Sequence, residues 1–188
     1  MSGNPDDTQA WSRALAGDGE AFGEIFDRHR DRIVRHSRRL VTSSHDVDDV
    51  VAITFLEAWR LRDRVRIVDG SVLPWLLVTA TNCAQNLSRG IRRHRALLHK
   101  LPAEPDAPDH AETIDGGPAT DALNSLSVAD RQVIVLCVLE GFSTNEAAAA
   151  LAVPPGTVKS RLSRAKRRLA QRVAPQAQLS TIRPEEAK

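Results

Sequence analysis

Residues 143–169 read STNEAAAALAVPPGTVKSRLSRAKRRL, and this stretch decides the fold of the last third of the chain. Ser143 followed by Glu146 is a capping pair, so a short Ala-rich helix is expected to begin there. After the turn at 152–156, apolar residues recur at helical spacing and predict a last helix over about 157–173. A short helix, a tight turn and a second amphipathic helix together predict a helix-turn-helix.

The second helix of this motif is rich in cations and contains no acid. Cations bind nucleic-acid phosphates because neutralising the phosphates releases counterions. Directional donors near the start of the helix suit base edges, and the candidates are Lys159, Ser160, Arg161, Ser163 and Arg164. Cations further along are better placed to clamp the backbone, namely Arg167, Arg168 and Arg172. A solvated basic face is the alternative, but the preceding cap, helix and turn favour DNA binding.

The composition changes sharply before this motif. Residues 102–118 are rich in Pro, Gly and acidic side chains and lack apolar periodicity, which is typical of an extended or disordered linker. After the linker, Ser127 with Asp130 predicts the start of a helix over Val128–Glu140, which Gly141 should end.

Helical patterns also fill the first half of the chain. They cover Trp11–Ala16, about 22–41, a stripe from Val47 to Trp59 preceded by the capping pair Ser43 and Asp46, and a helix that begins near Ser71. We therefore expect an all-α fold with two small helical domains joined by a flexible linker, the C-terminal one a helix-turn-helix. The expected divisions are an N-terminal segment (1–20), a first domain (21–98), a linker (99–121), the helix-turn-helix domain (122–174) and a tail (175–188).

The helix that begins near Ser71 carries two stripes. The apolar stripe, which predicts a core face, is Leu73, Leu77, Ala80, Ala84, Leu87 and Ile91. The other stripe combines an aromatic ring, hydrogen-bonding groups and cations, in Trp75, Thr79, Asn82, Asn86, Arg89 and Arg93. It could simply face solvent, but single-stranded nucleic acid needs a ring for stacking, donors for base edges and cations for phosphates.

The acidic residues Asp46, Asp48 and Asp49 lie in the first turn of their helix, where carboxylates favour the helix dipole. A protein-binding face that presents Asp49 and Glu57 is the functional alternative. A catalytic carboxylate pair is unsupported, because no nucleophile, metal ligands or phosphate loop accompanies the acids.

Other features of the sequence narrow the class of protein. The two cysteines lie far apart, and the six histidines form no metal-binding motif, so neither a metal nor a cofactor is expected. No stretch is long and apolar enough to span a bilayer, and the polar N-terminus lacks a signal-peptide core. We expect a cytoplasmic protein that is not inserted in a membrane.

Three quoted segments in this order resemble a known family. They are DVDDVVAITFLEAWR (46–60), LPWLLVTATNCAQNLSR (73–89) and the stretch from Leu123 to Leu169, of which GTVKSRLSRAKRRL is the most specific part. The chain resembles the extracytoplasmic-function sigma factors, the small two-domain members of the bacterial sigma-70 family. The likeness covers nearly everything from Ala21 to Val173.

The resemblance implies a promoter-specificity subunit of RNA polymerase without catalysis of its own. Its first domain would dock on the β′ clamp through the helix that carries Asp48, Asp49 and Glu57, and would open the −10 element. The stripe Trp75, Thr79, Asn82, Asn86, Arg89 and Arg93 falls on the −10-facing helix, and the loop before it, Arg66–Leu73, would capture a flipped base. The C-terminal domain would contact the β flap and read −35 duplex through Thr144, Lys159, Ser160, Arg161, Ser163 and Arg164, with Arg168 on the backbone. The expected partners are core polymerase, promoter DNA and, in members that have one, an anti-sigma factor.

The chain departs from the family pattern at three places. Ala52-Ile53 stands where the docking helix usually carries Gln-Glu, so two polar polymerase contacts are replaced by apolar ones. Ala152 stands where the turn usually has Gly, which costs about 1 kcal/mol if that residue is left-handed. The capture loop is slightly long, so its base preference does not carry over.

A stand-alone helix-turn-helix regulator is the rival hypothesis, but it would need a ligand pocket, a phosphoacceptor domain or a dimer helix in the first half. An enzyme is the third hypothesis, and no residues of the sequence support it.

Overall fold

The computed structural model describes residues 6–41, 43–98 and 117–179. Within these ranges every named element is helical, and Val68 and Ser71 form an isolated β-bridge. The expected all-α class is confirmed. In the same part of the chain, no helix is both long enough and apolar enough to cross a membrane.

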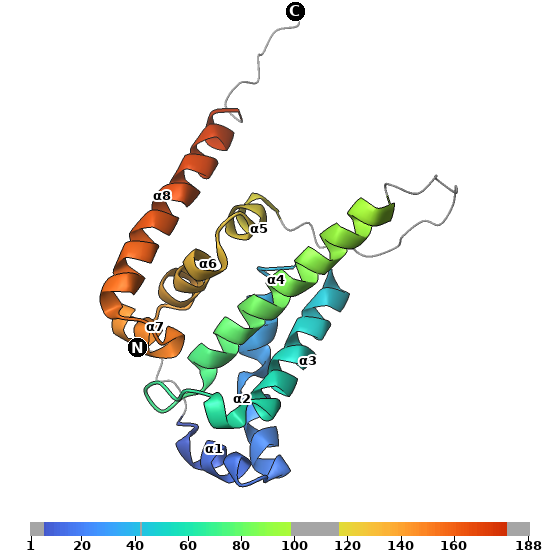
Figure 1. Ribbon diagram of the computed structural model, residues 1–188, viewed down its shortest axis with the longest axis vertical. Helices are drawn as coiled ribbons and strands as arrows, with labels where there is room; N and C mark the ends of the chain where they lie inside the picture. Colours follow the sequence, from blue (N-terminus) through green and yellow to red (C-terminus); the bar gives the residue numbers. More distant parts are fainter. Residues whose placement is uncertain (1–5, 42, 99–116, 180–188) are drawn as a thin grey trace, which may run out of the picture.

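The N-terminal domain is a helical bundle built on the apolar stripes. Its elements are α1 (Thr8–Leu15), α2 (Gly19–Ser37), α3 (Ser44–Arg60), the single 3-10 turn η1 (Arg62–Arg64) and α4 (Leu73–Leu98). Helices α2, α3 and α4 pack against one another, and α1 closes one end of the bundle (Figure 1). The buried core includes Ile25, Val50, Phe55, Leu77 and Ala84, so the stripes expected on α3 and α4 do face inward.

Two helix starts in this domain show what capping patterns can predict. Asp18 caps α2, because its carboxylate accepts a hydrogen bond from the backbone N–H of Ala21 at 3.0 Å. Ser43 occupies the N-cap position of α3, but its side chain makes no capping hydrogen bond. The expected capping pair of Ser43 and Asp46 is therefore wrong, although the helix starts where the pair placed it.

The C-terminal domain contains α5 (Gly117–Asn124), α6 (Val128–Ile134), the π-helical turn η2 (Val135–Leu139), α7 (Thr144–Leu151) and α8 (Pro155–Leu179). Helix α5 begins in the last residues of the expected linker. Helix α8 packs on α6, α7 and α5.

Two expected helices of this domain differ in the structure. The single helix expected over Val128–Glu140 is instead α6 followed by a π-helical turn, in which the N–H of Glu140 reaches back to the carbonyl of Val135 at 3.0 Å. Gly141, at φ 78°, ends it as expected. Helix α8 starts two residues earlier than expected, because Pro155 occupies its first turn, where no N–H is needed.

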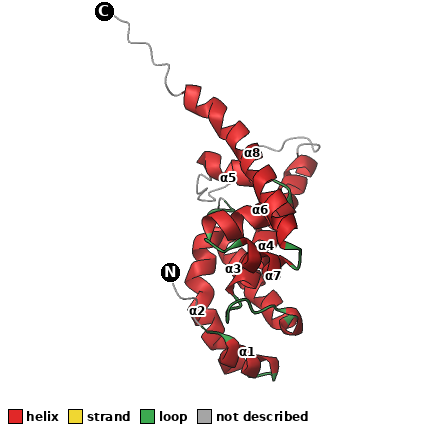
Figure 2. Cartoon of the chain, turned by 90° about the vertical axis from the view of Figure 1, so that its left-hand side faces the viewer, coloured by secondary structure: helices red, strands yellow, loops and turns green. Residues whose placement is uncertain are grey.

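The two domains lie against each other. Helix α4 packs against α6, η2 and α7, which Figure 2 shows from the side. The stripe of α4 that was expected to bind nucleic acid is therefore close to the helix-turn-helix domain.

Candidate nucleic-acid interface

The helix-turn-helix is held by a complete capping box and a left-handed turn. The Ser143 hydroxyl accepts from the N–H of Glu146 at 3.2 Å, and the Glu146 carboxylate accepts from the N–H of Ser143 at 2.6 Å. Ala147, Ala148 and Ala150 are buried, which allows α7 to approach α8 closely. The next residue after α7, Ala152, has φ 55° and ψ 42°, so it is left-handed and meets the condition under which Ala costs about 1 kcal/mol relative to Gly.

This geometry leaves the start of α8 open to solvent. Lys159, Ser160 and Ser163 are exposed, whereas Arg161 and Thr144 are half-buried. The Ser160 hydroxyl donates to the carbonyl of Thr157 at 3.0 Å, one turn back in the same helix. The N-terminal half of α8 therefore presents donors and cations on a surface that a duplex could approach.

Arg164 and Arg168 have a partner inside the domain that the sequence did not reveal. Arg164 donates to the two carboxylate oxygens of Asp130 at 2.7 and 3.3 Å, and Arg168 donates to it at 3.2 Å. The hydrogen bond from Arg164, with further bonds and charges nearby, holds the pKa of Asp130 below its usual value, and the Asp130 side chain is only 1% exposed. Both arginines remain about half exposed, so α6 orients them without covering them.

On α4, the structure separates the expected strand-binding stripe into two parts. Trp75, Thr79 and Asn82 are half-buried, while Asn86 and Arg89 are exposed. The Asn82 side-chain oxygen accepts a hydrogen bond from Gln132 of α6 at 2.7 Å. The side chain of Arg93 lies outside the described residues.

The expected protein-binding face lies on α3. Asp48 and Asp49 are exposed near its start, and Glu57 pairs with Arg60 one turn on, with an oxygen–nitrogen distance of 2.6 Å. Two large apolar side chains lie on the same helix in solvent, Ile53 at 42% and Leu56 at 63% exposure. Exposed apolar residues framed by acids are typical of a protein-binding surface.

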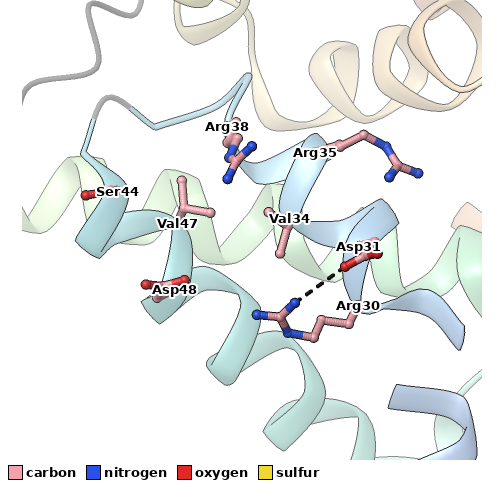
Figure 3. Close-up of a pocket in the computed structure, with 8 residues that line it drawn as sticks. All are labelled: Arg30, Asp31, Val34, Arg35, Arg38, Ser44, Val47 and Asp48. Atoms are coloured by element: carbon pink, nitrogen blue, oxygen red, sulfur yellow. Dashed lines mark hydrogen bonds and ion pairs between the residues drawn. The ribbon is translucent and has the colours of Figure 1, made fainter. Parts of the chain in front are cut away.

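A groove of about 690 Å³ runs between α2 and α3 beside this face. Figure 3 shows Arg30 of α2 and Arg38, the residue that follows α2, directed toward the side of the groove formed by Val47 and Asp48. Arg30 is paired with Asp31 at 3.4 Å. Sequence reasoning missed this basic wall, because the arginines of α2 lie on the polar side of an ordinary amphipathic helix.

A buried carboxylate connects the two domains. Glu140, which follows the π-helical turn, accepts from Arg32 of α2 at 2.7 Å and from Arg39, in the turn just after α2, at 3.1 Å. His36 Nδ1 lies 3.7 Å from the carboxylate, which is too long for a hydrogen bond, and the contact is an ion pair only when the imidazole is protonated. Burial alone would raise the pKa of Glu140, but His36 and Arg32 outweigh it and lower the pKa to about 2. The Glu140 side chain is 3% exposed, so its charge depends on these partners.

The same regions of the chain match known families. Residues 25–96 match sigma-70 region 2, and residues 118–169 match sigma-70 region 4. The chain is 34% identical over 170 residues to the RNA polymerase sigma factor NccH of Alcaligenes xylosoxydans xylosoxydans, covering 84% of this chain and 89% of that protein. It is 33% identical over 165 residues to the ECF RNA polymerase sigma factor SigM of Mycobacterium tuberculosis strain H37Rv, covering 87% and 83%.

This chain belongs to the extracytoplasmic-function RNA polymerase sigma factors. A solved structure of CnrH in complex with the cytosolic domain of CnrY shares its architecture, with a TM-score of 0.63 and 28% identity over 91% of this chain and 99% of that one. The sigma factor thus has two helical domains, region 2 and region 4, and takes part in transcription initiation with core RNA polymerase.

Within the described residues of the sigma factor, no group of three His, Cys, Asp or Glu side chains could hold a metal ion. The expected −35, −10 and polymerase contacts remain predictions about how its charged and apolar faces are used.

Proposed function

We propose that this sigma factor directs core polymerase to promoters by gripping DNA at two points, with α8 on the −35 duplex and α4 with its preceding loop on the −10 strand. The observation that carries the proposal is the start of α8, where a capped helix-turn-helix exposes Lys159, Ser160 and Ser163 beside the oriented Arg164. Donors at the start of such a helix reach base edges in the major groove.

Docking on the β′ clamp is assigned to the exposed face of α3. Asp48 and Asp49 supply charge, and the exposed Ile53 and Leu56 supply apolar area, Ile53 being one of the two residues, Ala52-Ile53, that replace the polar pair usual in the family. The β flap is the proposed partner of region 4. The protein acts in the cytoplasm, where its polymerase is, and has no catalytic activity of its own. The sigma factor RpoE of Bartonella quintana, whose solved structure is similar to this chain, is bound by the anti-sigma factor NepR, so an anti-sigma factor is a further candidate partner.

Transcription by reconstituted holoenzyme tests the proposal. The purified protein is added to core polymerase, and transcripts from a library of genomic fragments are sequenced. A shared motif upstream of the new start sites is the expected result. No stimulation on any fragment, together with tight binding of one duplex by the protein alone, would instead indicate a stand-alone regulator.

A further inference from the structure

The N-terminal segment contains a buried carboxylate that belongs to none of the surfaces above. Asp7 is 0% exposed and occupies the N-cap position of α1, but its side chain makes no capping hydrogen bond to that helix. Its carboxylate accepts hydrogen bonds from Arg28 at 2.6 Å, from His29 at 2.8 Å, from the Ser71 hydroxyl at 2.8 Å and from the backbone N–H of Val72 at 2.9 Å. One side chain thus joins α2 to the end of the loop that precedes α4.

The backbone makes the same connection. The N–H of Asp7 donates to the carbonyl of Gly70 at 2.6 Å, and Val68 and Ser71 exchange both of their backbone hydrogen bonds. Between them, Asp69 has φ 48° and Gly70 has φ 75°, the two positive angles of a tight hairpin turn. A Cβ on Gly70 would lie 3.3 Å from the carboxylate of Asp6, so the N-terminal segment packs directly on this turn.

This anchoring determines which side chains of the loop face solvent. Val68 and Val72 are buried on the anchored side, whereas Arg66 and Ile67 are exposed. A buried, fully hydrogen-bonded carboxylate costs more desolvation than an apolar residue of similar size would, and its bonds require one geometry. The backbone at Arg66 and Ile67 is therefore held from the opposite side of the loop, while the Arg66 side chain itself donates to the carbonyl of Ala149 in α7 at 3.5 Å.

We infer that Asp7 is a positioning residue for base recognition in the −10 element, because it holds the loop 65–72 in one conformation for the strand it meets. The inference rests on the proposed function, in which this loop contacts the −10 strand. Asp7 touches no DNA in this scheme. A loop that is already ordered loses less conformational entropy when it binds. The preferred base benefits most, because its contacts require this one conformation of the loop.

The test compares base preference rather than overall affinity. Holoenzyme is incubated with single-stranded oligonucleotides randomised across the −10 segment, and the bound fraction is sequenced to give the preference at each position. Asp7→Asn keeps the size of the side chain but puts an amide N–H against groups that donate. Ser71→Ala removes one donor and leaves the buried carboxylate with its other partners, so it tests the same link if Asp7→Asn folds poorly.

We expect both variants to reduce the preference at the same one or two positions by about three- to tenfold, while binding of −35 duplex is unchanged. The control is Asp18→Ala, which removes the cap of α2 at a distance from the loop and should lower stability without changing any preference. A preference profile that survives in both variants, with only affinity reduced, assigns Asp7 a purely structural role and overturns the inference. A wild-type holoenzyme with no preference at any position overturns the proposed function as well, and it is recognised without any variant.

Discussion

Arg164 shows how one side chain can serve both the fold and recognition. Its guanidinium is bonded to Asp130 while it remains about half exposed on the side of α8 that is proposed to face the −35 duplex. We expect Arg164→Ala to weaken binding of −35 duplex by about 1–3 kcal/mol and to relax selectivity at one base pair. Competition binding with a set of single-base variants of the duplex measures both effects.

The matched control for Arg164 is Arg168→Ala. This arginine shares Asp130 but lies one turn further along the helix, where backbone contacts are expected. Its loss should weaken all duplexes alike and reduce the salt dependence of binding. Unchanged selectivity in Arg164→Ala would remove that residue from the set that contacts bases.

The Asp7 carboxylate predicts how stability depends on pH. Burial alone would raise its pKa, but the hydrogen bonds from His29 and Arg28 outweigh it and lower the pKa from 3.8 to about 2. Because the folded pKa is the lower one, the unfolded chain takes up the proton first as pH falls. The stabilisation is complete above about pH 4 and is lost as pH falls through about 2.

Urea unfolding of the wild type and of Asp7→Asn tests whether the stabilisation by Asp7 is lost as pH falls. The difference in free energy of unfolding between them should narrow by about 2 kcal/mol from pH 7 to pH 2. A difference that stays constant across this range would show that the charge of Asp7 does not stabilise the fold.

At the scale of an element, the turn of the helix-turn-helix carries avoidable strain. Ala152 is left-handed, a conformation that glycine adopts without the steric cost of a Cβ. Ala152→Gly should therefore raise the free energy of unfolding of region 4 by about 0.5–1 kcal/mol. The matched control is Ala149→Gly, at an exposed position inside α7, which should lower it by about 1 kcal/mol. Thermal unfolding of both variants measures these two changes in stability. Equal destabilisation by the two substitutions would contradict the prediction.

The same elements show which structural features sequence patterns can predict and which they cannot. Period and capping are local, so they predicted α3 and the Ser143–Glu146 box. Asp130 and Glu140 were not predictable, because their partners lie 34 to 38 and 101 to 108 residues away and no periodicity encodes such pairs. The π-helical turn was not predicted either, because the apolar run Val133–Leu139 is equally compatible with a continuous α-helix.

At the scale of the whole molecule, the arrangement of the domains conflicts with a two-point grip. The −10 and −35 elements are about 25 base pairs apart, which is roughly 85 Å of duplex at 3.4 Å per base pair. In the structure, however, Glu140 of region 4 is bonded to Arg32 of α2, and Gln132 of region 4 is bonded to Asn82 of α4. Helix α4 packs against α6 and α7 (Figure 1). The two regions must therefore separate before both elements can be bound.

Glu140 is the residue whose removal should favour this separation. It is a buried carboxylate held by Arg32, Arg39 and His36, and Glu140→Gln removes the charge while keeping the size of the side chain. Without the charge, the three basic groups lose their common partner, and the amide N–H of Gln opposes their donors. We expect a larger radius of gyration for the free protein, measured by small-angle X-ray scattering, with unchanged helix content by circular dichroism.

The control for this variant is Glu24→Gln, which removes the same charge from an exposed position on α2, where the partner is Arg13 of α1. It should leave the radius of gyration unchanged, so any expansion in Glu140→Gln is due to the contact between the domains and not to net charge. If both variants stay as compact as the wild type, the apolar packing of α4 against α6 and α7 is sufficient to hold the domains together. Opening would then require binding to polymerase, because only a partner that binds the separated form better can shift that equilibrium.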